Sequence, residues 1–424
     1  MSRSERRVVI TGMGVVAPGG IGRKRFWHLL TSGRTATRTI SFFDPDPYRS
    51  QVAAECDFAP RAEGLGAQEV RRMDRVAQFA AACTDQCLAD SGLEFEGLPP
   101  HRTGTSIGTA VGCTMSLDEE YRVVSDSGAS WLVDHSYAIP HLYDQFVPSS
   151  VAAEVAWRAG AEGPAAVVST GCTSGLDSVG HARALIREGS ADVMIAGASD
   201  APISPITAAC FDAIKATTPS NDVPESASRP FDRNRDGFVL GEGAAVFVLE
   251  ELEHARRRGA EIVAEVRGFA SRCNAFHMTG LRPDGKEMAE AIRASLAEAR
   301  VAPEDVDYVN AHGSGTKQND RHETAAFKRA LGEHARRTPI SSVKSMVGHS
   351  LGAIGSIEIA ASALAIANDT VPPTANLTEA DPECDLDYVP REARELPTET
   401  VLTVGSGFGG FQSAMVLTAH GGAQ

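Results

Sequence analysis

The sequence of 424 residues has no run of 18 or more apolar residues. A helix that crosses a bilayer needs about 20 such residues, so we expect no membrane span and no membrane partner. Residues 1–7 also lack the apolar core of a signal peptide. None of the eight cysteines forms a CxxC pair, and scattered single cysteines are typical of reduced thiols. These absences together predict a cytoplasmic protein.

The chain also has fewer basic than acidic residues: 40 Lys and Arg and 55 Asp and Glu give a net charge of −15. Nucleic-acid surfaces are basic, so we expect no nucleic-acid partner. The HExxH pattern of zinc proteases is missing as well, because His322-Glu323 is followed by Thr-Ala-Ala. We therefore predict no metal site.

Two glycine-rich stretches lack the context of a nucleotide site. Residues 405–410 read GSGFGG and fit GxGxxG by letter, but the alternation over residues 411–417 predicts a strand. A dinucleotide site needs a helix at that point. Residues 11–14 run into Pro18 without a third glycine. We therefore predict that this chain binds no nucleotide cofactor.

What the chain does contain is the composition and the patterning of a soluble α/β protein. It has 42% hydrophobic and 22% charged residues, as globular domains do. Short apolar runs alternate with helical patterns, which predicts an α/β fold. The candidate strands are residues 8–10, 105–109, 166–169, 193–196 and 244–249 in the first half, and 262–268, 306–311, 340–343, 401–404 and 413–417 in the second.

The matching order of these strands predicts an internal duplication with a period of about 200 residues. We place the two halves at residues 1–258 and 259–424. In each half the third strand leads to a reactive residue at a helix start, Cys172 in the first and His349 in the second. Three stretches without clean periodicity are expected to form loops or caps on the core: residues 31–68, 116–150 and 216–240.

Residues 165–175, AAVVSTGCTSG, place Cys172 between an apolar strand and a small-residue helix. A helix N-terminus carries partial positive charge and unpaired N–H groups, and both favour the nucleophilic thiolate. Gly171 and Gly175 let the backbone approach a substrate closely. From these residues alone, a buried and inert core cysteine is an equal alternative.

Two of the twelve histidines also stand at the ends of strands. His312 follows the apolar run 306–311, and His349 lies in VKSMVGHSLG, residues 343–352, before a small-residue helix. A histidine at a helix N-terminus is driven towards its neutral form. Neutral imidazole can donate a hydrogen bond to a carbonyl oxygen on which negative charge develops. Because open α/β sheets place their sites at the carboxyl ends of strands, Cys172 and the two histidines predict an active site.

Three stretches together resemble the β-ketoacyl synthase family of the thiolase fold: residues 170–177 (TGCTSGLD), 310–323 and 343–352. The separations of Cys172 from the two histidines match the family's Cys-His-His triad, and the similarity extends from residue 8 to residue 410. The resemblance implies a duplicated thiolase-like fold, layered αβαβα with two mixed five-stranded sheets.

Within the family, two further stretches resemble the α ketosynthase of type II aromatic polyketide synthases. They are residues 313–320, GSGTKQND, and residues 407–414, GFGGFQSA. This resemblance implies an acyltransferase that performs iterative decarboxylative Claisen condensation in polyketide and antibiotic biosynthesis. It also implies that the chain itself holds no cofactor, because the phosphopantetheine group arrives on an acyl carrier protein.

The resemblance assigns a role to each residue of the triad. Cys172 takes the acyl chain from the carrier protein as a thioester, which is covalent catalysis. His312 and His349 bind the malonyl thioester, promote its decarboxylation and stabilise the enolate that attacks the acyl-cysteine. The backbone N–H groups of Cys172 and Phe408 would form the oxyanion hole, and Phe408 matches the family's gating phenylalanine.

Other residues match supporting positions of the family. Lys344 and Glu323 match charged groups that orient the histidines. For Asp320 and Glu323, a capping box before residues 324–327 is an equal alternative. Ser314 and Thr316 match positions that touch the phosphopantetheine arm.

The partners are implied by the same resemblance. Arg71 and Arg72 match carrier-docking residues, although a solvated helix start is an equal alternative. The fold implies a dimer that pairs edge to edge through residues 165–170. The expected partner is the chain-length factor, a paralogue without the reactive cysteine, and a homodimer is the alternative.

Other members of the superfamily fit less well. Degradative thiolases carry a second cysteine near the C-terminal glycine loop, and residues 405–410 have none. Ketosynthases that use a coenzyme A primer usually have Asn in place of the second histidine, and His349 is intact. Two alternatives stay open: a fatty-acid elongating synthase and a non-catalytic scaffold subunit that binds carrier proteins.

Overall fold

The computed structural model describes residues 6–93, 98–130 and 133–421. Residues 1–5, part of the N-terminal segment that lacks the apolar core of a signal peptide, lie outside the described residues. All ten predicted strands are present; several extend beyond the predicted ranges, whereas the strands predicted at 306–311 and 340–343 are shorter, over 308–310 and 340–341.

The first half forms a sheet in the order β6-β5-β7-β9-β1. Strands β6, β5 and β7 are parallel, whereas β9 is antiparallel to both of its neighbours. The residues of β1, β5 and β7 are buried throughout, because helices cover both faces of the sheet. The strands are β1 (Val8–Ala17), β5 (Thr103–Gly108), β6 (Ala165–Val168), β7 (Val193–Asp200) and β9 (Gly243–Glu251).

The second half repeats this order and these directions as β12-β11-β15-β16-β10. The predicted duplication is therefore confirmed. A short ladder between β1 and β10 joins the two five-stranded sheets edge to edge. The strands are β10 (Ala264–Cys273), β11 (Tyr308–Asn310), β12 (Ile340–Ser341), β15 (Thr400–Gly407) and β16 (Phe411–Thr418).

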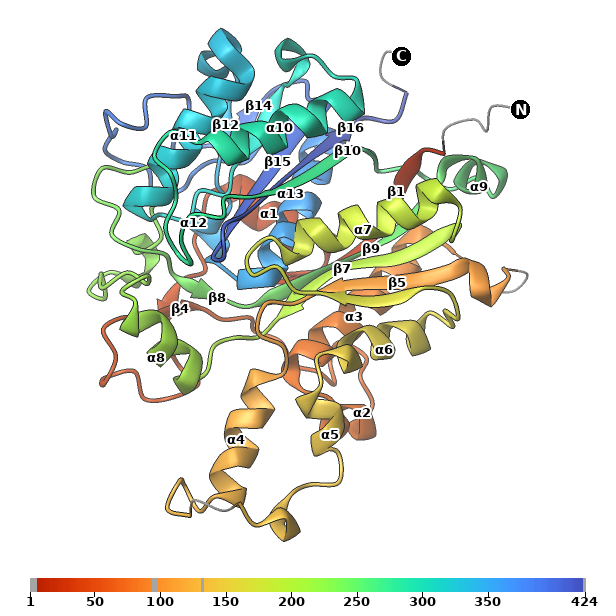
Figure 1. Cartoon of the computed structure of the whole chain (residues 1–424), viewed down its shortest axis with the longest axis vertical. Coiled ribbons are helices and arrows are strands. Elements are labelled where there is room, and N and C mark those ends of the chain that lie inside the picture. The colour runs from red at the N-terminus through yellow and green to blue at the C-terminus, as the bar shows by residue number, and fades with distance from the viewer. Residues whose placement is uncertain (1–5, 94–97, 131–132, 422–424) are drawn as a thin grey trace.

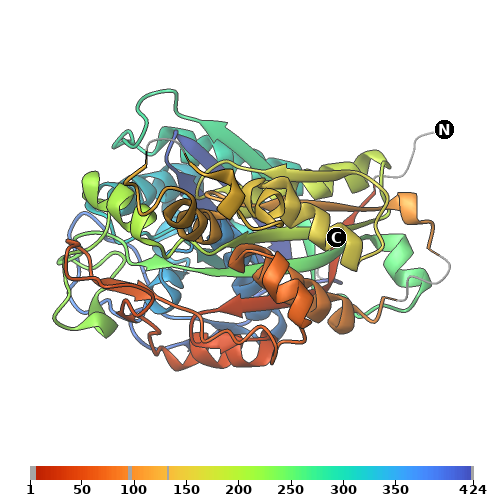
Figure 2. The ribbon, with the colours of Figure 1, turned by 90° about the horizontal axis from the view of Figure 1, so that it is seen from below.

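Helices complete the predicted αβαβα layering (Figure 1). Helices α7 (Ser174–Glu188) and α13 (Ile354–Asn368) lie between the two sheets. The outer face of the second sheet is covered by α10 (Lys286–Ala299) and α11 (Lys317–Leu331). The outer face of the first is covered by α3 (Arg75–Ser91) and α6 (Ser149–Arg158), the side from which Figure 2 is seen.

One helical stretch, Leu351–Asn368, is long and apolar enough to cross a membrane by length and composition alone. In the fold 89% of it is buried inside the protein. A helix that is apolar on all sides is typical of such a central position, and we assign it to the core.

The three stretches expected to be loops or caps contain more structure than their sequence predicted. Strands from two of them form a small separate sheet in the order β3 (Arg38–Thr39), β4 (Val52–Ala54), β8 (Leu240–Gly241). Helices α4 (Thr114–Val124) and α5 (Leu142–Phe146) form an arm that projects at the bottom of Figure 1, and α4 has no buried residue. An exposed helix of this kind buries no apolar stripe on its own chain, so its pattern is not that of a core helix.

The remaining elements are short or peripheral. They are α1 (Arg23–Ser32), α2 (Ala67–Arg72), α4 (Thr114–Val124), α5 (Leu142–Phe146), α8 (Pro205–Ala213), α9 (Leu252–Arg257), α12 (Lys344–Val347), β2 (Gly20–Ile21), β3 (Arg38–Thr39), β4 (Val52–Ala54), β8 (Leu240–Gly241), β13 (Thr370–Val371), β14 (Arg394–Glu395) and the 3-10 turns η1 (Pro100–Arg102), η2 (His135–Tyr137), η3 (Pro224–Ser226), η4 (Pro303–Asp305), η5 (Gly332–Arg336) and η6 (Leu351–Ala353).

Candidate active site

Cys172 lies in the tight turn between β6 and α7, as the sequence predicted. Gly171 has a φ of 59°, a left-handed conformation that favours glycine. Gly175 lies in the first turn of α7 and contacts the backbone of α13. An added Cβ on Gly175 would lie 2.4 Å from the nitrogen of Ser356. The two glycines therefore allow the turn and bring the first turn of α7 against the second half.

The thiol of Cys172 is half-buried. Burial raises the pKa of Cys172 to about 11, although the charge of Lys344 and the backbone N–H of Phe408 act in the opposite direction. The helix start was expected to favour a thiolate, but in this environment the thiol stays protonated at neutral pH. Burial outweighs the nearby positive charge because it penalises the ionised sulfur directly.

His312 follows β11, and its backbone is held by the side chains of Glu323 and Lys344. The carboxyl group of Glu323 accepts the N–H of His312 at 2.5 Å and that of Gly313 at 2.7 Å. The Nζ of Lys344 donates to the carbonyl of His312. Both residues therefore orient His312 through its main chain, which agrees with the supporting role that the resemblance implied.

His349 lies between α12 and η6, and strand β8 fixes its backbone. Its N–H donates to the carbonyl of Val239 at 2.8 Å, and its carbonyl accepts the N–H of Gly241 at 2.9 Å. The ring of Phe238 packs edge-on against the imidazole at 5.1 Å. The rings of His349 and His312 are 5.3 Å apart and nearly perpendicular, at 82°.

Both imidazoles are held in the neutral form. Burial lowers the pKa of His312 and of His349 well below the usual value, and the charge of Lys344 lowers both further. Neutral histidines were expected, but from helix N-termini; burial and Lys344 are the larger causes here. The Nδ1 atom of each ring is buried and has no hydrogen-bond partner among the residues that the structure describes.

The three residues meet in one cavity of about 470 Å³. Among the predicted site residues, Cys172, His312, His349, Ser314, Thr316 and Phe408 line it, together with residues of α8, residues 236–238 and residues 279–281. The structure therefore brings together the predicted nucleophile, both histidines and both hydroxyl side chains.

Phe408 lies in the turn between β15 and β16, directly over the cysteine. Gly407 approaches so closely that an added Cβ would be 3.2 Å from the nitrogen of Cys172. The N–H of Phe408 donates towards the sulfur of Cys172 and lowers its pKa. This geometry supports the predicted oxyanion position at the Phe408 N–H. The Phe408 ring is 38% exposed and contacts Phe211 at a centroid distance of 6.5 Å.

The charged residues that support the site lie behind the cavity wall. Lys344 forms a fully buried ion pair with Glu358 of α13. Burial raises the pKa of Glu358 to about 7 and that of Glu323 to about 8. Glu358 was not predicted, because it stands in an apolar helix where only its burial beside a lysine distinguishes it.

The capping-box alternative for Asp320 and Glu323 is wrong. Helix α11 begins at Lys317, so both residues lie inside the helix, and the N-cap is Thr316, whose hydroxyl accepts the N–H of Asn319 at 3.3 Å. Asp320 instead pairs with the buried Arg235 at 3.3 Å. The pairing of two buried charges fixes the start of α11 beside the cavity.

Ser314 and Thr316 present hydroxyl groups in the cavity wall, 3.0 Å from one another. Hydroxyls can donate to and accept from amide groups of a ligand. The contact with phosphopantetheine that the resemblance implies stays a prediction.

Arg71 and Arg72 lie on α2, away from the cavity. Arg71 is exposed, whereas Arg72 forms an ion pair with Glu154 and lies over the ring of Trp157. Both residues stand in the last turn of α2, so the alternative of a solvated helix start is wrong; Arg71 is solvated at a helix end, and Arg72 is engaged on both sides. Carrier docking by either residue stays a prediction.

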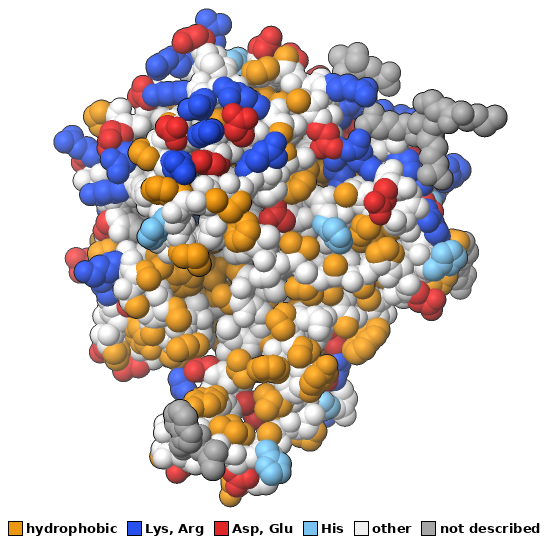
Figure 3. Space-filling view, viewed as in Figure 1, with side chains coloured by type: hydrophobic (Ala, Val, Ile, Leu, Met, Phe, Trp, Pro, Cys, Tyr) orange, Lys and Arg blue, Asp and Glu red, His pale blue; other side chains and the backbone are white. Residues whose placement is uncertain are grey.

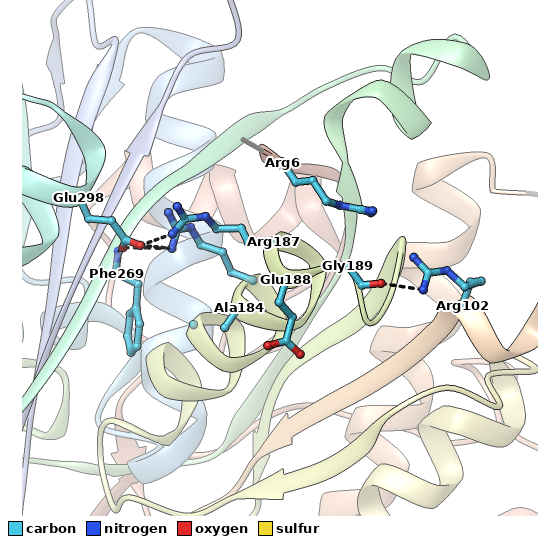
Figure 4. A pocket seen from close by; sticks show the side chains of 10 residues that line it. Arg6, Arg102, Ala184, Arg187, Glu188, Gly189, Phe269 and Glu298 are labelled. Atoms are coloured by element: carbon cyan, nitrogen blue, oxygen red, sulfur yellow. Dashed lines mark hydrogen bonds and ion pairs between the residues drawn. The ribbon is translucent and has the colours of Figure 1, made fainter. Parts of the chain in front are cut away.

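A second hollow, of about 940 Å³, lies on the far part of α7 and contains no nucleophile (Figure 4). Its arginines share carboxylates: Arg6 and Arg102 pair with Asp192, and Arg183 and Arg187 pair with Glu298. The arginines of this hollow are thus engaged in two ion-pair clusters, one around Asp192 and one around Glu298, so we place the chemistry at Cys172. Among the described residues, no group of three or more His, Cys, Asp or Glu could hold a metal ion.

Comparison with known proteins gives the family. The model of the β-ketoacyl synthase N-terminal domain matches residues 5–255, and that of the C-terminal domain matches residues 263–378. The tetracenomycin polyketide synthase ketoacyl synthase alpha subunit of Streptomyces glaucescens is 67% identical, over 98% of this chain and 97% of the relative.

Solved structures agree with this result. One is a ketosynthase from the complex of a type II polyketide synthase acyl carrier protein with its ketosynthase bound to the hexaketide; it has a TM-score of 0.91 and 37% identity, and the match covers 98% of this chain and 100% of that one. Another is the ishigamide ketosynthase/chain length factor, with a TM-score of 0.88, 33% identity and coverage of 99% and 100%. The resemblance drawn from the motifs is confirmed, and the chain belongs to the β-ketoacyl synthase family.

Proposed function

We propose that this chain is the condensing subunit of a type II aromatic polyketide synthase. It extends an acyl chain on Cys172 by two-carbon units taken from malonyl-acyl carrier protein. The observation that carries the proposal is the meeting of Cys172 with two neutral histidines in one cavity. The 67% identity to the tetracenomycin subunit supports the polyketide class.

The first step loads the cysteine. The sulfur of Cys172 attacks the thioester carbonyl of the acyl-carrier protein, the bond to the carrier's sulfur breaks, and the thiol proton ends on the released carrier thiol. The N–H of Phe408 lies at the sulfur and would stabilise the oxyanion of the tetrahedral intermediate. Because the pKa of Cys172 is about 11, the proton leaves as the carbonyl is attacked rather than before.

The second step uses the histidines. The malonyl group loses CO₂, and the electron pair of the broken C–C bond forms an enolate on the thioester. His312 and His349 are neutral and can donate N–H groups to the enolate oxygen. The enolate carbon then attacks the acyl-cysteine, a new C–C bond forms, and the bond to Cys172 breaks. The released sulfur takes up a proton, which completes the cycle.

The chain holds no cofactor of its own in this proposal. The phosphopantetheine arm of the carrier protein enters the cavity, and the hydroxyls of Ser314 and Thr316 bond its amides. Arg71 attracts the acidic carrier protein, against the general repulsion from a net charge of −15. We place the reaction in the cytoplasm, which is consistent with eight cysteines that are all free.

The working state is a heterodimer with a chain-length factor. Strand β6 ends the first sheet, and its residues are exposed or only half-buried, whereas β5 and β7 are buried throughout. A free sheet edge is a template for pairing with another chain. The face in Figure 3 that carries α7 and β5 is mostly apolar and uncharged, with the charged side chains gathered above it.

Product analysis tests the proposed function. Co-expression with a cysteine-less chain-length-factor paralogue should give polyketide products from malonyl-carrier protein, with a chain length set by the paralogue. Release of saturated fatty acyl chains by this chain alone with fatty-acid reductases, at a length independent of the paralogue, would favour the fatty-acid alternative. A chain that binds the carrier protein but never forms an acyl adduct would favour the scaffold alternative.

A further inference from the structure

Asp200 carries a buried carboxyl group outside the Cys-His-His cavity. Asp200 is the last residue of β7 and is fully buried. Its carboxylate is 2.7 Å from the hydroxyl of Thr109, 2.8 Å from the N–H of Ala110 and 3.2 Å from the N–H of Val111, all of which donate to it. It therefore fixes the segment that follows β5.

The same carboxylate reaches across to the second half of the protein. The backbone N–H of Gly352 also donates to it. An added Cβ on Gly352 would lie 2.5 Å from Oδ2 of Asp200 and 2.5 Å from the nitrogen of Ala110. Only glycine allows this approach, so Asp200 joins the segment after β5 to the segment after His349.

The segment that Asp200 holds carries backbone strain. Leu351, two residues after His349, has a φ of 49°, which is uncommon for a residue other than glycine. Its side chain lines the active-site cavity. Such a conformation persists only where the surroundings impose it. Upstream, β8 pins His349 itself, and downstream the contact with Asp200 holds Gly352.

On the other side, the segment after β5 holds the turn that carries Cys172. The N–H of Thr109 donates to the carbonyl of Val168 at 3.1 Å, and its carbonyl accepts the hydroxyl of Ser174 at 3.4 Å. An added Cβ on Gly108 would lie 2.5 Å from the carbonyl oxygen of Ser174. Asp200 thus contacts the segment after β5, and that segment in turn contacts Val168 and Ser174, which lie on either side of Cys172 in the chain. The negative charge of Asp200 also raises the pKa of Cys172, because it disfavours the ionised sulfur.

We infer that Asp200 is a positioning residue that sets the register between the Cys172 turn and the His349 segment. It does not touch the substrate. Its effect falls on the step that needs both sites at once, because carbon–carbon bond formation requires the enolate at the histidines to reach the acyl-cysteine. Loading of Cys172 and decarboxylation at the histidines each need one site alone. The inference rests on the proposed function.

The experiment separates the three steps in the full-length chain with its paralogue. Acylation of Cys172 is followed by intact-protein mass spectrometry, decarboxylation by CO₂ release from malonyl-carrier protein, and condensation by product formation. Asp200→Asn replaces an acceptor oxygen with a donor that faces N–H groups. Gly352→Ala acts from the opposite side and forces the carboxylate away. Both variants should lose at least about ten-fold more condensation than either half-reaction.

Asp74→Asn is the matched control. Asp74 is also a buried carboxylate outside the cavity that accepts backbone N–H groups from two segments, but it joins Val76 of α3 to Ser116 of α4 rather than the Cys172 turn to the His349 segment. It should lower the melting temperature without changing the ratio of the three rates. A parallel loss of all three steps in the Asp200 and Gly352 variants, or full condensation in either, would overturn the inference. A wild-type chain that performs neither half-reaction would overturn the proposed function itself.

Discussion

Burial shifts the pKa values of the cysteine and the histidines in the cavity in opposite directions. It raises the pKa of Cys172 and lowers those of His312 and His349, so all three are uncharged at neutral pH. An uncharged imidazole can donate to a developing enolate as it stands, whereas the thiol has to lose its proton as it attacks. The histidines are therefore prepared for decarboxylation without help from the cysteine.

This difference predicts how single substitutions divide the reaction. Cys172→Ala should abolish condensation but leave measurable decarboxylation of malonyl-carrier protein. His312→Ala and His349→Ala should each lower decarboxylation by roughly 10²–10³-fold, the loss expected when a donor to a developing negative charge is removed. CO₂ release from labelled malonyl-carrier protein measures all three. An equal loss of decarboxylation in the three variants would show that the roles are assigned wrongly.

For single residues, the sequence predicted the place in the secondary structure better than it predicted burial and the resulting pKa. The strand-to-helix turn at Cys172 and the strand end at His312 followed from apolar runs and glycines. The pKa of Cys172 did not, because burial by Phe408 and by the second half depends on contacts between distant segments. Glu358 was missed for the same reason: its partner Lys344 lies on a different element.

Among the elements, α2 presents the two candidate docking residues in different states. Arg71 is exposed and can meet an acidic partner, whereas Arg72 already pairs with Glu154. Arg71→Glu should therefore raise the KM for the carrier protein steeply at low salt, with little change in turnover of a small thioester mimic. Salt should weaken this difference. An unchanged KM would remove Arg71 from the docking surface.

Arg72→Glu should behave differently from Arg71→Glu. It places a carboxylate beside Glu154 and removes the contact with Trp157, so it should lower the melting temperature as well as carrier affinity. Thermal unfolding of the two variants, measured side by side, checks this. Equal melting temperatures would mean that the ion pair does not stabilise α2.

Some of the helices and strands could be predicted from the sequence, and others could not. All ten core strands were predictable, because each is a short run of strand-forming residues between helical patterns. The small sheet that contains β8 was not, since its strands have two or three residues and come from stretches without periodicity. Yet β8 fixes the backbone of His349 through Val239 and Gly241. The start of α11 was misplaced because Thr316, not Asp320, supplies the cap.

For the whole molecule, three buried carboxyl groups predict how stability depends on pH. Burial raises the pKa of Glu323 to about 8, that of Glu358 to about 7 and that of Asp200 to about 6. The unfolded chain has lost these protons by about pH 5, so the folded state binds more protons at neutral pH. The free energy of unfolding should therefore fall as the pH rises from 6.5 to 8.

The slope should be at most about 1.4 kcal/mol per pH unit for each proton that only the folded state holds. His312 and His349 act in the opposite direction near pH 6.5, because the unfolded chain still protonates them partly there and the folded chain does not. Their contribution becomes small above about pH 7.5, so the slope between pH 7.5 and 8 reports the carboxyl groups most cleanly. Denaturant unfolding at several pH values measures the slope, and Glu358→Gln should make it shallower. A free energy of unfolding that stays constant or rises over this range would contradict the assigned pKa directions.

The dimer is the other property of the whole molecule. An obligate interface through β6 should bury more than about 2,000 Å², and co-expression with the paralogue should raise soluble yield. Sedimentation of the chain with and without the paralogue measures the oligomeric state. A chain that stays monomeric and fully active when its paralogue is present would contradict the heterodimer.

The most direct test of the central claim is a chase of the acyl-cysteine. The chain and its paralogue are loaded with a labelled acyl-carrier protein, and the peptide that contains Cys172 is followed by mass spectrometry while malonyl-carrier protein is added. We predict an acyl adduct on Cys172 that disappears as CO₂ is released and reappears on the carrier protein as a chain two carbons longer. An adduct on another residue, or an adduct on Cys172 that malonyl-carrier protein does not remove, would contradict the account.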